Sequence, residues 1–112
     1  AYYVIQDVET WTGVWNQHVG FMVDSFEMPE IDFSKYTVIA VFMGEMRTGG
    51  YAIQVYDIID ADSSILVKVE KTEPGPDCVV TQALTQPYHI VQIAKTDKPV
   101  YFDTVTRIIE SP

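Results

Sequence analysis

The sequence has little cysteine and little positive charge, and it lacks any long hydrophobic run. Its 112 residues include one cysteine, which excludes an internal disulfide and a zinc site built from cysteines. Seven basic residues stand against 16 acidic ones, and the net charge of −9 argues against binding to nucleic acid or to anionic membranes. The longest apolar run, residues 38–43, is far shorter than the ~20 residues that a membrane-spanning helix needs.

The remaining composition is that of a soluble globular protein. Hydrophobic residues make up 47% of the chain and charged residues 21%, which favours a packed core over disorder. No linker divides the sequence, so residues 1–112 are predicted to form a single domain. The chain starts at Ala1 without a signal peptide, which leaves open that an upstream leader or lipid anchor was removed.

A helix is predicted near the start of the chain, over residues 7–20. Asp7 can accept hydrogen bonds from the first backbone N–H groups of a helix, and Gly20 is a natural stop. Apolar side chains recur at spacings of three and four along this segment and just beyond it. They are Val8, Trp11, Trp15, Val19 and Met22. We therefore expect one helix whose two tryptophans face a sheet.

Short apolar or alternating segments predict about six β-strands. They are residues 2–5, 36–43, 51–59, 65–70, 88–94 and 100–109. The segment 36–43 is apolar throughout and fits a central strand covered on both faces, whereas residues 60–63 and 96–99 are typical of hairpin turns. Two prolines flanking a glycine predict a loop over residues 73–77, and residues 78–84 fit either a strand or a short helical turn.

These elements predict an α+β fold. We expect a mainly antiparallel β-sheet that curls into a sandwich or a partial barrel, with the N-terminal helix packed on it. Antiparallel pairing is expected because a parallel pair needs a crossover connection, and only one helix is available to make one. A pure immunoglobulin-like sandwich would require that residues 7–20 not be helical.

No set of side chains in the sequence matches a catalytic or metal site. His18 and His89 are the only histidines and stand far apart in the chain, which argues against a metal site. Cys78 follows an acid and precedes two valines, so it fits a buried structural thiol better than a reactive one. Residues 57–62 hold three aspartates without the spacing of a calcium loop and fit a solvated turn. We therefore predict no catalytic residue, no metal and no cofactor.

The most distinctive local feature is the segment Thr48-Gly49-Gly50-Tyr51. Adjacent glycines adopt backbone angles closed to other residues and let another chain approach closely. Two interpretations are open: a bulged hairpin corner with Tyr51 turned into the core, or a recognition loop on a rigid sheet. Arg47 precedes this segment as a basic point on an acidic chain, which predicts salt-sensitive association if the loop binds a partner.

Three segments carry a family resemblance. They are Phe42-Met43-Gly44-Glu45, Thr48-Gly49-Gly50-Tyr51 and Gln86-Pro87-Tyr88-His89-Ile90-Val91. They resemble the C-terminal domain of the PrcB family, which is named for an accessory subunit of a bacterial cell-surface protease complex. The resemblance covers residues 32–102, and Arg47 stands where the family pattern has proline. A fainter similarity is to chagasin-type cysteine-protease inhibitors, on loops that contain Thr48-Gly49-Gly50-Tyr51, Pro74-Gly75-Pro76 and Gln86-Pro87-Tyr88.

The resemblance to the PrcB family implies a non-catalytic protein-binding or accessory domain of an exported protein, located in the cell envelope or outside the cell. The implied partner is a protein, with an exported protease as the candidate; neither nucleic acid nor membrane insertion is expected. The residues implied to bind it are Arg47, Thr48, Gly49, Gly50, Tyr51, Pro87, Tyr88 and His89. Three alternatives stay open: a chagasin-like protease inhibitor, a small hydrolase that uses His89, and a purely structural domain. The sequence does not predict the oligomeric state.

Overall fold

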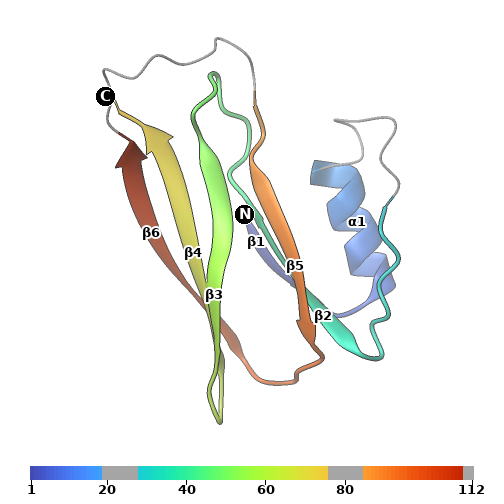
Figure 1. Cartoon of the computed structure of the whole chain (residues 1–112). Coiled ribbons are helices and arrows are strands. Elements are labelled where there is room, and N and C mark those ends of the chain that lie inside the picture. The colour runs from blue at the N-terminus through green and yellow to red at the C-terminus, as the bar shows by residue number, and fades with distance from the viewer. Residues whose placement is uncertain (19–27, 76–84, 110–112) are drawn as a thin grey trace.

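The computed structural model describes residues 1–18, 28–75 and 85–109, which form one helix and six strands (Figure 1). In chain order the elements are β1 (Tyr2–Ile5), α1 (Val8–His18), β2 (Tyr36–Phe42), β3 (Ala52–Asp60), β4 (Ile65–Pro74), β5 (Tyr88–Ala94) and β6 (Val100–Ile109). Each predicted strand is present, and α1 lies inside its predicted bounds. The predictions for Gly20, for Cys78 and for residues 78–84 fall outside the described residues.

The strands form two sheets of three strands each. One sheet has the order β1-β2-β5 and the other has the order β3-β4-β6. Three neighbouring pairs are antiparallel, and the fourth, β4 with β6, is parallel. The two sheets face each other, and α1 lies beside the first sheet, on the right in Figure 1. The α+β prediction is confirmed, and the mainly antiparallel sheet takes the form of a sandwich.

The start of α1 is capped by the side chain of Asp7, as the sequence predicts. One carboxylate oxygen of Asp7 accepts a hydrogen bond from the backbone N–H of Thr10 at 2.7 Å. The other oxygen accepts from the Thr10 hydroxyl at 3.0 Å. These bonds, the backbone one foremost, hold the pKa of Asp7 below its usual value.

The buried face of α1 consists of Trp11, Val14 and Trp15, which pack on β2. The two tryptophans therefore face a sheet, as predicted. The prediction for Val8 is wrong, because its side chain is 58% exposed. Val8 is the first residue of the helix and lies one turn before this buried face. The other two members of the predicted stripe, Val19 and Met22, fall outside the described residues.

β2 is the central strand of its sheet and is covered on both faces, as its continuous apolar run predicts. Val38, Ala40 and Phe42 belong to the core beside α1. Ile39 and Val41 belong to a second core between the two sheets. Alternate side chains of one strand thus supply both cores, because successive residues point to opposite faces.

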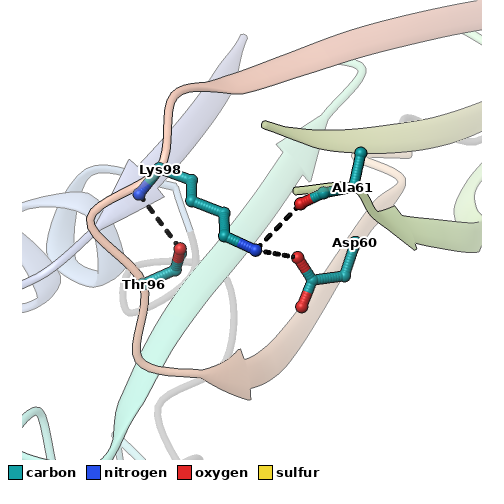
Figure 2. A network of polar contacts seen from close by, with 4 residues as sticks. All are labelled: Asp60, Ala61, Thr96 and Lys98. Atoms are coloured by element: carbon teal, nitrogen blue, oxygen red, sulfur yellow. Dashed lines mark hydrogen bonds and ion pairs between the residues drawn. The ribbon is translucent and has the colours of Figure 1, made fainter. Parts of the chain in front are cut away.

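The prediction of a hairpin at residues 96–99 is wrong, because β5 and β6 belong to different sheets. After pairing with β2, the chain leaves β5 and crosses to the second sheet, where β6 lies parallel to β4. The crossover between the parallel strands therefore runs through a strand of the opposite sheet, and no helix is needed. Lys98 holds this crossing to the β3–β4 turn: its Nζ donates to Asp60 Oδ1 at 2.6 Å and to Ala61 O at 2.8 Å (Figure 2).

The second sheet departs from the expected pattern at two points. The prolines predict a loop over residues 73–77, but β4 continues to Pro74. At Pro74 the strand has passed the end of its pairing with β3, so the missing N–H breaks no bond to that strand. On β3, a β-bulge between Val55 and Asp57 shifts the alternation, and Ile58 takes the inward position after it.

Two side chains join the sheets near opposite edges of the sandwich. Tyr2 of β1 packs against Phe102 of β6 with ring centroids 5.0 Å apart, and its hydroxyl lies 2.8 Å from the Thr104 hydroxyl. On the other side, Nδ1 of His89 on β5 accepts a hydrogen bond of 2.9 Å from the backbone N–H of Val55 on β3. β1 therefore lies beside β6, and β5 lies beside β3.

Candidate functional site

The two segments predicted to bind a partner lie side by side at one end of the sandwich (Figure 1). We call residues 43–51 and 85–88 the paired loops. The backbone N–H of Met46 donates to Thr85 O at 2.7 Å, and the N–H of Thr85 donates to Met46 O at 2.9 Å. This isolated bridge joins segments that are distant in the sequence.

Two further hydrogen bonds hold the paired loops together. The Thr85 hydroxyl donates to the backbone carbonyl of Thr48 at 3.0 Å. The backbone N–H of Met43 donates to Pro87 O at 3.0 Å. The Thr48 segment and the Pro87-Tyr88 segment therefore form one surface. In the sequence they are two separate candidate sites.

The first of the paired loops connects β2 in one sheet to β3 in the other, so the interpretation as a bulged hairpin corner is wrong. Gly44 and Gly50 have φ angles of +84° and +91°, a region that favours glycine over residues with a side chain. Arg47 and Gly50 are exposed, whereas Thr48, Gly49 and Tyr51 are half-buried. Arg47, the one basic residue of this loop, is thus exposed to solvent, and Gly44 and Gly50 allow the backbone conformation of the loop.

An aromatic cluster adjoins the paired loops, and we define it as Tyr3, His18, Phe42 and Tyr88. The His18 ring stacks on Phe42 with centroids 4.3 Å apart, and Tyr88 stacks on Phe42 at 5.8 Å. Tyr3 meets Phe42 edge-on at 5.8 Å. Because Tyr88 follows Pro87 directly, this cluster anchors the second loop to α1 and to the first sheet.

His18 is the histidine of the aromatic cluster. Its Nε2 lies 2.8 Å from the Tyr3 hydroxyl. Burial lowers the pKa of His18 below its usual value, and the positive charge of the chain's amino group lowers it further. The folded chain therefore holds the neutral imidazole more firmly than the unfolded chain does.

We expect the free energy of unfolding to decrease as the pH falls below about 6.5, the usual pKa of histidine. As the pH falls, the unfolded chain takes up the His18 proton before the folded chain does, so acid favours unfolding. Above about pH 6.5 the imidazole is neutral in both states, and His18 no longer lowers the free energy of unfolding. Urea unfolding of the wild type and His18→Phe, between about pH 7.5 and pH 5.5, measures it. The variant should show the shallower pH dependence, and parallel curves would contradict the assignment.

His89 lies at the seam between the sheets, on the face of β5 opposite to Tyr88. Its Nδ1 accepts the Val55 N–H, so the neutral ring carries its proton on Nε2. Its place among the predicted binding residues stays a prediction. The contact that the structure gives it joins two strands.

A cavity of about 520 Å³ lies between α1, β5 and the segment around Ile31. Its lining is mostly apolar and includes Trp11, Trp15, Pro29, Ile31, Tyr88 and Ile90.

Among the described residues, no three side chains of His, Cys, Asp or Glu gather in a way that could hold a metal ion. No helix within these same residues is long and apolar enough to cross a membrane.

Sequence reasoning missed the residue that joins the paired loops, Thr85. Nothing in its neighbourhood marks it, since a threonine before Gln86-Pro87 fits an ordinary loop. Its role depends on Met46 and Thr48, which lie far away in the sequence. Only the three-dimensional structure shows such a contact.

A comparison with protein-family models matches residues 37–94 to the family described as PrcB C-terminal. This match covers just over half of the chain, from β2 to β5. It therefore includes both paired loops, whereas β1, α1 and β6 lie outside it. Comparisons with curated proteins and with solved structures found no match.

Proposed function

Because the chain belongs to the PrcB C-terminal family, we propose that it is a non-catalytic accessory domain that binds another protein through its paired loops. The family assignment supports the accessory role. The finer parts of the proposal are that the domain works outside the cytoplasm and that its partner is an exported protease. These parts rest on the family's name and on no contact within the chain.

The observation that carries the proposal is the hydrogen-bonded pairing of the two loops. A loop surface that is already ordered loses less conformational entropy when a partner binds, which favours affinity. Loops on a rigid β scaffold are also common places for binding residues. Arg47 stands exposed on this surface, and arginine is enriched among the residues that contribute most to protein interfaces.

Replacing Arg47 and Tyr51 together by alanine is expected to reduce partner capture by about tenfold or more, the usual effect of losing interface anchors. The tagged chain is incubated with an extract of its native cell envelope, and the retained proteins are quantified by mass spectrometry. A protein whose recovery falls in the variant, and also falls with rising salt, is the predicted partner. An exported protease among such proteins supports the finer proposal.

A matched control is Asp62→Ala/Ser63→Ala in the β3–β4 turn. This turn lies at the other end of the sandwich in Figure 1 and is exposed. Equal losses in both variants, or none in either, contradict the proposal, provided that circular dichroism shows both variants to be folded. Inhibition of papain-like or subtilisin-like proteases by the purified chain would favour the chagasin-like alternative instead.

A further inference from the structure

Within the described residues, the outer edge of β6 is an open sheet edge. β6 ends the order β3-β4-β6, and no described strand pairs with its outer side (Figure 1). Its ten residues include no proline and no shift of register against β4, two of the features that block such edges in other proteins. The other edge strands are protected: β1 has four residues, and the His89 contact joins β5 to β3 beside the bulge of β3.

Large apolar side chains are exposed along this edge strand. Their exposed fractions are 58% for Tyr101, 44% for Val105, 59% for Ile108 and 46% for Ile109. A long strand with exposed apolar side chains and open backbone groups is a template for pairing with another strand.

The backbone of β6 determines which residues can form bonds across the outer edge. On the β4 side, Pro99 O accepts from the Ile65 N–H, and Ile109 O accepts from the Gly75 N–H. Backbone groups of alternate residues point to opposite sides of a strand, so the odd-numbered residues of β6 face β4. The even-numbered residues therefore direct their N–H and C=O groups outward.

β6 is complementary to a second copy of itself laid antiparallel with Val105 at the centre. In this register Asp103 lies opposite Arg107 of the second copy, and Arg107 lies opposite its Asp103. Within the described residues of their own chain, neither Asp103 nor Arg107 forms an ion pair. The register thus gives each of these charges an opposite charge directly across the strand pair, the favourable arrangement.

The remaining pairs of this register agree with the backbone geometry. The even-numbered residues meet as hydrogen-bonded pairs, and the odd-numbered ones meet as the closer, non-hydrogen-bonded pairs. The pairs are Phe102 with Ile108, Thr104 with Thr106, Tyr101 with Ile109, and Val105 with Val105. From Tyr101 to Ile109, each apolar residue therefore meets another apolar residue, and the two threonines meet each other.

Other registers lose one of these features. Moving the centre to Thr104 places Asp103 opposite Val105 and leaves Arg107 opposite Tyr101, so the ion pairs are lost. A slip of one residue places odd-numbered residues opposite even-numbered ones, and outward backbone groups then find no partners. Charge and hydrogen bonding together select the register centred on Val105.

We propose that two copies of this chain associate through antiparallel β6 strands, with Asp103 of each copy paired with Arg107 of the other. The β3-β4-β6 sheet of one copy then continues into the β3-β4-β6 sheet of the other, and the two form one sheet across the dimer. Because the copies run antiparallel, their paired loops lie toward opposite ends of the dimer. This association is independent of the proposed function and needs no other protein.

Sedimentation equilibrium of the purified chain, from low micromolar to near-millimolar concentration, tests the dimer. We expect a concentration-dependent dimer for the wild type. The variants D103R and R107D each place like charges opposite one another at two positions per dimer. Each reversal should raise the dissociation constant by about tenfold or more.

Mixing the two variants supplies the sharpest test. A D103R chain carries two arginines at these positions and an R107D chain carries two acids, so only the mixed dimer restores both ion pairs. We therefore expect the mixture to dimerise when neither variant does so alone. The control D62R makes the same change of net charge as D103R, in the exposed β3–β4 turn, and should dimerise like the wild type.

Three results would overturn the inference. The first is a wild-type chain that stays monomeric over the whole concentration range. The second is a dimer that both charge reversals leave unchanged, which places the interface elsewhere. The third is a mixture of the two variants that associates no better than each variant alone, while thermal unfolding shows both to be folded.

Discussion

Trp11→Ala is expected to lower the free energy of unfolding by about 3–5 kcal/mol, the usual cost of removing a large aromatic side chain from a core. Trp11 is 1% exposed and packs beside Trp15 with ring centroids 5.6 Å apart. Its indole N–H also donates to Pro29 O at 3.0 Å, which ties the segment before β2 to α1. One side chain therefore joins three parts of the structure: the helix, the first sheet and the connecting segment.

Urea unfolding measures this loss, and Val8→Ala on the same helix is its matched control. Val8 is 58% exposed, so its truncation should change the free energy of unfolding by no more than about 0.5 kcal/mol. For a domain with a total stability of about 5–15 kcal/mol, this loss is a large fraction of the whole, so the Trp11 variant should unfold at a clearly lower urea concentration than the wild type. Equal effects of the two substitutions would show that α1 does not pack on β2 as described.

His89→Leu is expected to lower the free energy of unfolding by about 1–3 kcal/mol, because the Val55 N–H loses its hydrogen-bond acceptor. This bond joins β5 to β3, so its loss should loosen the seam between the sheets. Hydrogen exchange at the Val55 amide should become faster in the variant than in the wild type. The effect is therefore both global, in stability, and local, at one amide.

His89→Asn serves as the rescue variant, since its side-chain oxygen can accept a hydrogen bond near the position of Nδ1. We expect it to restore most of the stability that His89→Leu loses. If asparagine and leucine have the same effect, the Val55 bond does not contribute to stability. The result also bears on the hydrolase alternative, which requires His89 for catalysis rather than for joining two strands.

The sequence predicts the elements of this fold well where the signals are local. Asp7 before an apolar helical stripe marks the start of α1, and the continuous apolar run before Met43 marks a strand covered on both faces. Both signals arise from neighbours within a few residues. These two predictions therefore do not depend on how distant parts of the chain pack.

Pairing between strands could not be predicted in the same way. The short, polar connection from residue 95 to residue 99 looks like a hairpin turn, yet it carries the chain from one sheet to the other. β6 fits beside β4 in the second sheet, where its Val100 and Phe102 pack against the core between the sheets. That fit involves residues far apart in the sequence and leaves no local pattern.

The candidate site shows the same division. In the sequence, the glycines and Arg47 mark one loop as a candidate site, and the family resemblance marks the Pro87-Tyr88 segment. That the two loops form one surface depends on the bonds of Thr85 to Met46 and Thr48. The sequence therefore predicts the parts of the surface, and the structure shows how they are assembled.

In the proposed function, the paired loops contact a protein partner. Photocrosslinking in the native cells tests this contact most directly, with a photoreactive amino acid placed at Arg47 in one experiment and at Asp62 in the other. Both positions are exposed, and Asp62 lies in the β3–β4 turn at the far end of the sandwich. We predict a crosslink to a single protein from position 47 and none to that protein from position 62. Absence of any crosslink from position 47, or equal yields from both positions, would contradict the claim.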